Sequence, residues 1–179
     1  VLLTAWGSGQ NALMSYLAMP FIALFGLTPA AVRLPNAISS CLTLVVFWRI
    51  ARRARGRRFG LCALFMLCLC PWHIMLGRWA LESNQLPFWL ISGVYAVQRS
   101  RERPWLLVPG AACLALCLYA YGTAFFFLPF FALGALVWLR RDLKPGPALC
   151  AAAVFVLIAL PIALCQLINA LELDEIRIL

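Results

Sequence analysis

Four side chains that could do chemistry lie close together between two apolar stretches of the chain. His73, Arg78, Glu82 and Asn84 all fall within CPWHIMLGRWALESNQLPF, residues 70–88. His73 is the only histidine in the sequence, and Glu82 is one of its six acidic residues. Histidine and glutamate can transfer protons, and the planar fork of arginine suits a phosphate or a carboxylate. This polar junction is therefore the first candidate for a functional site.

The spacing of Arg78 and Glu82 allows two interpretations. If residues 78–82 are helical, the two side chains lie on one helical face, four residues apart, and can form an ion pair. In the structural interpretation, Arg78 also extends toward lipid headgroups. In the functional one, Arg78 binds a lipid-linked phosphate, while Glu82 orients a hydroxyl, holds a divalent cation or tunes a neighbouring acid. Glu82 is then the only candidate metal ligand, and metal binding stays open.

The elements around this junction are those of an integral membrane protein. The chain is 65% hydrophobic and 12% charged, with a mean hydropathy of +0.93. Soluble globular domains have about 25% charged residues, so the chain has too few polar residues to cover a soluble core. The eight cysteines lie in apolar segments and act there as small hydrophobes. With a single histidine and no CxxC pair, a structural zinc site is not expected.

A membrane-spanning helix needs roughly 20 mostly apolar residues. Six segments are candidates, the third of them short: 34–51, 59–76, 84–98, 104–121, 123–139 and 146–166. Ahead of them, Asn11 to Phe25 is apolar with scattered polar residues and is followed by Gly26. We expect a helix on the membrane surface here, with a re-entrant helix or a seventh span as alternatives. The predicted fold is thus an all-α polytopic helix bundle.

Basic residues predict the orientation of this bundle. Twelve of the fifteen Lys and Arg residues fall in the first, third and fifth junctions between spans, at 49–58, 99–103 and 140–144. Cytoplasmic loops carry such an excess, so these junctions are predicted to be cytoplasmic. This clustering does not resemble a phosphate-tracking face, and nucleic acid is not an expected partner. The junction at 73–84 and the turn at 119–123 are then exoplasmic.

Three further residues on the predicted exoplasmic side are candidates for substrate binding. Arg33 follows the surface helix, and a structural tie to that helix is the alternative. Tyr121 lies in the YAYG turn, where a tyrosine is usually a membrane anchor but could pack on a sugar ring or a prenyl chain. Gln10 belongs to a polar run that is either a simple loop or part of an acceptor-binding surface. His73 and Asn84 are candidates for substrate binding as well. His73 could instead be a plain interface residue, and Asn84 could either cap the next helix or bind sugar hydroxyls.

The order of these motifs resembles the bacterial membrane glycosyltransferases of the protein O-mannosyltransferase and aminoarabinose-transferase superfamily. The resemblance covers essentially all 179 residues. It is carried by the ordered set of motifs rather than by one of them. The matching motifs are WGSGQ at 6–10, PFIALFG at 20–26, VRLP at 32–35, PWH at 71–73, RWALESN at 78–84, YAYG at 119–122, PI at 161–162 and IN at 168–169.

The resemblance implies a GT-C fold and transfer of a sugar from a polyprenyl-phosphate carrier to an acceptor on the exoplasmic side. It implies a second acidic position that matches Glu82 four residues after Arg78, with His73 and Asn84 nearby. Some relatives have aspartate there and use it in a metal site. It also implies a leading catalytic carboxylate in a loop upstream of Val1, and residues 1–26 contain no acid.

From these features we expect one glycosyltransferase-like domain over 1–179, cut from a longer protein at both ends and inactive on its own. Its parts are an exoplasmic loop and surface helix (1–32), six spans (33–168) and the start of an exoplasmic loop (169–179). The expected partners are a polyprenyl-phosphate sugar, membrane lipids and an acceptor that is protein, lipid or cell-wall glycan, and the expected location is the cell membrane. The alternatives are a transporter or flippase for a lipid-linked substrate and a non-catalytic membrane scaffold.

Overall fold

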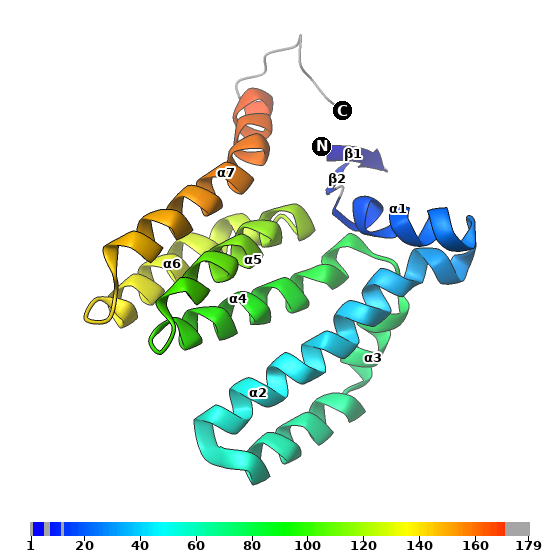
Figure 1. The fold of residues 1–179 in the computed structure, drawn as a ribbon. Helices are drawn as coiled ribbons and strands as arrows, with labels where there is room; N and C mark the ends of the chain where they lie inside the picture. Colours follow the sequence, from blue (N-terminus) through cyan, green and yellow to red (C-terminus); the bar gives the residue numbers. More distant parts are fainter. Residues whose placement is uncertain (1, 6–7, 12, 171–179) are drawn as a thin grey trace.

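The protein is an all-α membrane protein, and one short β-hairpin precedes its helices (Figure 1). The structure, a computed structural model, describes residues 2–5, 8–11 and 13–170. The hairpin pairs β1 with β2 in antiparallel register, with Leu3 opposite Gln10. The elements are β1 (Leu2–Ala5), β2 (Ser8–Asn11), α1 (Leu13–Phe25), α2 (Pro29–Leu69), α3 (Pro71–Arg78), η1 (Glu82–Gln85), α4 (Leu86–Ser100), η2 (Pro104–Leu106), α5 (Leu107–Ala120), α6 (Ala124–Leu139) and α7 (Pro145–Ala170).

Helix α2 contains the first predicted span and most of the second, joined by a sharp bend. The bend lies at Arg55 and Gly56, and Gly56 has φ +85° and ψ 179°, a conformation that glycine adopts without a steric penalty. The two limbs come close there, since a Cβ at Gly60 would lie 3.0 Å from the Cα of Arg52. The arginine-rich junction is thus a tight reversal rather than a long loop.

The predicted second span, 59–76, is wrong as one continuous helix. Helix α2 ends at Leu69, Cys70 is extended (φ −67°, ψ 114°), and α3 begins at Pro71. A residue that precedes proline is disfavoured in the helical region, which explains the break. Continuous hydropathy across this position therefore conceals a break in the helix, after which His73 and Gly77 lie against Ser40 of the first limb of α2.

Helices α4 to α7 share the main apolar core. Its buried members include Val97 of α4, Leu114 and Leu118 of α5, Leu128 of α6 and Ile162 of α7. Helices α4 and α5 approach closely where Gly93 faces Leu114 and Gly110 faces Ala96. Small residues at such crossings allow close packing of membrane helices.

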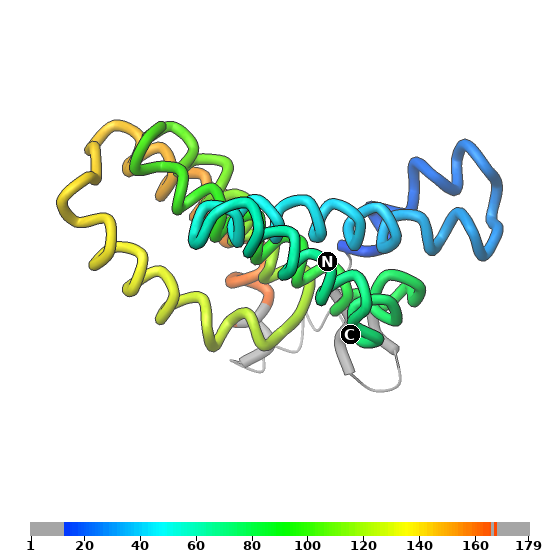
Figure 2. Tube along the Cα trace, turned by 90° about the horizontal axis from the view of Figure 1, so that it is seen from below, coloured from blue at the N-terminus to red at the C-terminus, as the bar shows by residue number. Residues whose placement is uncertain are grey.

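Within the described residues, two helices are long and apolar enough to cross a membrane, Pro29–Leu69 and Pro145–Cys165. Helix α1, the segment Pro104–Ala120 and helix α6 are apolar but shorter. The helical segments thus fall close to the predicted ones, whereas the count of six spans stays a prediction. Figure 2 shows that α1 and the start of α2 lie at the opposite end of the molecule from the α6–α7 connection.

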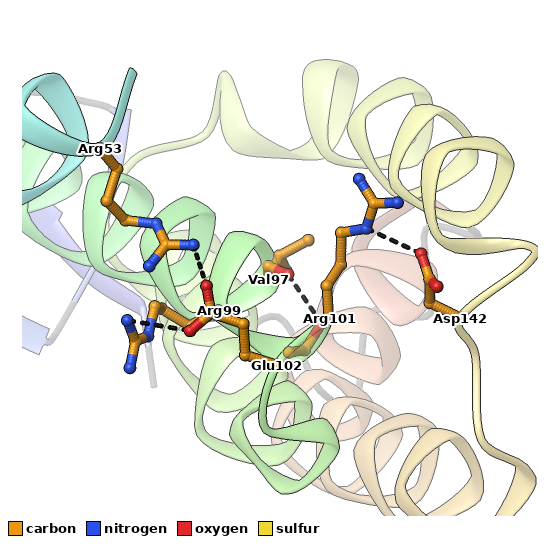
Figure 3. A network of polar contacts seen from close by, with 7 residues as sticks. Arg53, Val97, Arg99, Arg101, Glu102 and Asp142 are labelled. Atoms are coloured by element: carbon orange, nitrogen blue, oxygen red, sulfur yellow. Dashed lines mark hydrogen bonds and ion pairs between the residues drawn. The ribbon is translucent and has the colours of Figure 1, made fainter. Parts of the chain in front are cut away.

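The three basic junctions meet at one end of the bundle (Figure 3). Arg53 of the first junction and Arg99 of the third both pair with Glu102, the latter at 3.1 Å. Arg101 of the third donates from Nε to Asp142 of the fifth at 2.7 Å. The hydrogen bond from Arg53, aided by the neighbouring arginines, lowers the pKa of Glu102. These contacts fulfil the sequence prediction that the three junctions share one face.

The α4–α5 crossing yields a stability prediction. A Cβ at Gly93 would lie 2.7 Å from Cγ of Leu114, so Gly93→Val is expected to destabilise the protein by about 1–3 kcal/mol. Gly134 of α6 has open space around the corresponding position, so Gly134→Val is the matched control. Thermal unfolding of both variants in detergent checks this, and equal stability of the two would contradict the close approach.

Candidate functional site

The polar junction is held against the first limb of α2 by a buried asparagine. Asn36 is 1% exposed, and its side-chain amide donates to the carbonyl oxygens of Trp79 and Leu81, the latter at 3.2 Å. Residues 79 and 81 have extended backbone conformations. The carbonyl of Leu81 also accepts from the backbone N–H of Asn84 at the start of η1, at 3.2 Å. Asn36 therefore fixes the segment that leads into Glu82.

Gln85 completes a network of buried amides below this segment. Its Nε2 donates to Oδ1 of Asn36, and its Oε1 accepts from the hydroxyl of Ser39 at 2.8 Å. Gln85 is fully buried, and its Nε2 also lies 3.7 Å from Sδ of Met14 in α1. The network thus joins α1, α2 and η1, which together form the support under the polar junction.

His73 is anchored to α2 by a separate contact. Its Nε2 lies 3.0 Å from Oγ of Ser40, and the helices are so close here that a Cβ at Gly77 would lie 2.7 Å from the same oxygen. Partial burial lowers the pKa of His73 below its usual value, although hydrogen bonding to Ser40 opposes this shift. In its neutral form an imidazole donates from one ring nitrogen and accepts at the other, so it can bind a hydroxyl or relay a proton.

The side chain of Asn84 binds carbonyl groups at the end of α3. Its side-chain amide donates to the carbonyl of Leu76 at 2.9 Å and to that of Trp79 at 2.8 Å, and the residue is 8% exposed. It was expected to cap the following helix or to bind sugar hydroxyls. Its amide satisfies carbonyls of the preceding turn, as is needed at any helix C-terminus, and does not cap the following helix, whereas sugar binding stays a prediction.

The proposed helical pairing of Arg78 with Glu82 is wrong in its premise. Helix α3 ends at Arg78, Trp79 and Leu81 are extended, and Glu82 opens the short η1 helix. Residues 78–82 are therefore not one helical face. Arg78 is exposed and Glu82 is half-buried, and both border the junction that Asn36 and Gln85 support.

The remaining predicted residues lie on neighbouring elements. Arg33 is exposed within the second turn of α2, not in a loop between the surface helix and the first span. Tyr121 follows the end of α5 and is 42% exposed, as expected of an anchor or of a side chain that meets a ligand. Its neighbour Tyr119 donates to the carbonyl of Ile158 at 2.7 Å and so ties α5 to α7. Gln10 lies in β2, and its side chain is outside the described part, as are Trp6 and the acidic tail after 170.

Sequence reasoning missed the residues that position the junction, namely Asn36, Ser39, Ser40 and Gln85. A signal was present, because Asn36, Ser39, Ser40 and Thr43 place four polar side chains within two turns of an otherwise apolar span. Polar side chains in such a helix generally face the bundle interior or a partner. Their spacing of three and four residues indicates one shared face.

The described residues contain no group of three or more His, Cys, Asp or Glu side chains that could hold a metal ion. Glu82 is the one predicted metal ligand, and a cation normally needs several oxygen ligands. The described part of the junction therefore does not form a complete metal site from protein groups. A cation there would need ligands from elsewhere, such as a substrate phosphate.

Comparison with known proteins identifies a family for this chain. The family model described as dolichyl-phosphate-mannose-protein mannosyltransferase matches residues 11–164, which include α1 to α6 and most of α7. No curated protein and no solved structure matches the chain. The matched range includes the whole polar junction and its supporting network. The chain therefore belongs to the dolichyl-phosphate-mannose-protein mannosyltransferase family, a family of GT-C-type membrane glycosyltransferases.

Proposed function

We propose that the protein transfers a sugar from a polyprenyl-phosphate carrier to an acceptor on the exoplasmic side of the cell membrane, and that residues 70–85 form part of its active site. The observation that carries the proposal is the polar junction itself. A buried network of Asn36, Ser39 and Gln85 supports the segment between Arg78 and Glu82, and Ser40 contacts His73 beside it. Family membership supports the reaction class.

In this proposal each residue of the junction has a chemical task. Glu82 orients or deprotonates the acceptor hydroxyl, or tunes another acid that does so. Arg78 binds the lipid phosphate, whose negative charge grows as the sugar leaves. His73 and Asn84 border the substrate, and Arg33, Tyr121 and Gln10 contact it from neighbouring elements. The leading carboxylate implied by the family resemblance is expected outside residues 1–179, so this stretch alone is expected to be inactive.

The arrangement of the polar groups favours this function over transport. A transporter places its substrate site near the bilayer midplane, between broken helices. Here the described charged residues lie toward the two ends of the bundle, and the core of α4 to α7 is apolar. A non-catalytic scaffold does not explain Arg78, because this exposed arginine stabilises no described contact between helices.

The proposal is tested with the intact enzyme in membranes or detergent. A radiolabelled polyprenyl-phosphate sugar and the corresponding nucleotide sugar are supplied in parallel with membrane extracts as acceptors. We expect label to reach an acceptor from the lipid-linked donor and not from the nucleotide sugar. Transfer from the nucleotide sugar alone would reject the proposed donor, and accumulation of unchanged donor across the membrane would favour the transporter.

A further inference from the structure

A groove of mixed polarity lies at the basic end of the bundle, opposite the polar junction. Its polar part encloses about 400 Å³ and is lined by Arg53, Arg101 and Glu102. Its apolar part encloses about 420 Å³ and is lined by residues of α4 and α6, among them Val94, Phe131 and Gly134. Gln98 and Trp138 line both parts, so the groove changes from charged to apolar at these two side chains.

The arginines of the polar part retain donors for a ligand. The Arg53 and Arg101 side chains are 37% and 47% exposed. A guanidinium has five N–H donors, and the hydrogen bond that Arg101 makes to Asp142 uses the one at Nε (Figure 3). The guanidinium of Arg101 also lies 4.8 Å from the ring centroid of Trp138, which holds it at the groove.

Charge at this end favours an anion. The three basic junctions carry twelve Lys and Arg residues, against the two acids Glu102 and Asp142. Exposed ion pairs of the kind seen here contribute little stability, so their partners can be exchanged at low cost. Arginine forks match phosphate geometry closely. The polar part of the groove therefore suits a phosphate group.

The ligand must also match the apolar part. A free phosphate would leave that part exposed, and a neutral lipid would bring no net charge to balance the excess of basic residues around the polar part. A tryptophan at the boundary between charged and apolar surface is typical of the headgroup level of a membrane. We propose that this groove binds an anionic phospholipid, with its phosphate at Arg53 and Arg101 and an acyl chain along α4 and α6 past Gly134.

Native mass spectrometry of the intact protein tests the headgroup contacts. Phosphatidylglycerol and phosphatidylcholine with identical chains are titrated in parallel. We expect phosphatidylglycerol to bind about tenfold more tightly, and Arg53→Ala or Arg101→Ala to lower its affinity by about tenfold through loss of charge-assisted hydrogen bonds. Arg57→Ala removes an exposed arginine of the same junction that does not line the groove, and we expect a change of less than about twofold.

Two further variants separate lipid binding from damage to the fold. Glu102→Gln removes the acid that competes for Arg53, so we expect tighter binding of phosphatidylglycerol, opposite in sign to the arginine variants. Gly134 lines the apolar part and has open space at its Cβ position, so Gly134→Phe is expected to occupy that part and to abolish binding. Gly146→Phe, in open space away from the groove, is its control. Equal affinity for both lipids, weaker binding by Glu102→Gln, or unchanged binding by Gly134→Phe would overturn the proposal.

Discussion

Replacing Glu82 by glutamine in the intact enzyme is expected to slow sugar transfer by about 10²–10⁴-fold, the usual contribution of a positioned proton acceptor. Glutamine keeps the size of the side chain and removes its charge. Because η1 starts at Glu82 and is anchored through Gln85, the substitution should leave the junction in place. The measurement is the initial rate of transfer from the lipid-linked donor, with the amount of folded enzyme determined by size-exclusion chromatography.

Asp142→Asn provides the control for this substitution. Asp142 is an exposed acid at the opposite end of the bundle, where it pairs with Arg101. Its replacement removes the same charge and should change the transfer rate by less than about twofold, since surface pairs contribute little to stability. A folded Glu82→Gln enzyme with the activity of the control would remove Glu82 from the active site.

Replacing Gln85 by alanine is expected to destabilise the protein by about 2–4 kcal/mol. The substitution leaves Oδ1 of Asn36 and the hydroxyl of Ser39 without their described partner, in a fully buried site. It also leaves a cavity beside Met14. Denaturant or thermal unfolding in detergent measures the loss, and transfer activity should fall with it because the segment before Glu82 loses its support.

Gln98→Ala is the matched control, since Gln98 is a half-buried glutamine near the other end of α4. It should change the free energy of unfolding by no more than about 0.5 kcal/mol. In addition, Asn36→Ala combined with Gln85→Ala should cost less than the sum of the single substitutions, because each already breaks the same network. Additive effects, or a fully stable Gln85→Ala protein, would contradict the network.

The sequence predicts the helices well where a single physical signal governs them. The length of the apolar segments predicted the helices at 124–139 and 145–170 to within a few residues. The basic clusters predicted that the junctions containing Arg53, Glu102 and Asp142 lie at the same end of the bundle. The break at Cys70 was missed because hydropathy is insensitive to backbone direction. Pro71 was the available signal, since proline favours the first turn of a helix and an extended residue before it.

The polar junction could be recognised in the sequence, whereas the residues that support it could not; the roles of its reactive residues stay predictions. His73, Arg78 and Glu82 stand out because charge is rare in this chain. The pairing of Asn36 with Gln85, 49 residues apart, depends on how α2 lies against η1, which local patterns do not specify. The extended segment after Arg78 depends on the same contacts, through the Asn36 bond to Leu81. The helical spacing of Arg78 and Glu82 was misleading for that reason.

The central claim is that the polar junction faces the outside of the cell, where a lipid-carried sugar can reach it. Single cysteines introduced as Leu81→Cys and Trp105→Cys, in a background without the eight natural cysteines, test it because both positions are exposed at opposite ends of the bundle. A membrane-impermeant maleimide applied to intact cells should label position 81 and should label position 105 only after permeabilisation. Labelling of position 105 in intact cells, with position 81 protected until the membrane is opened, would contradict the account.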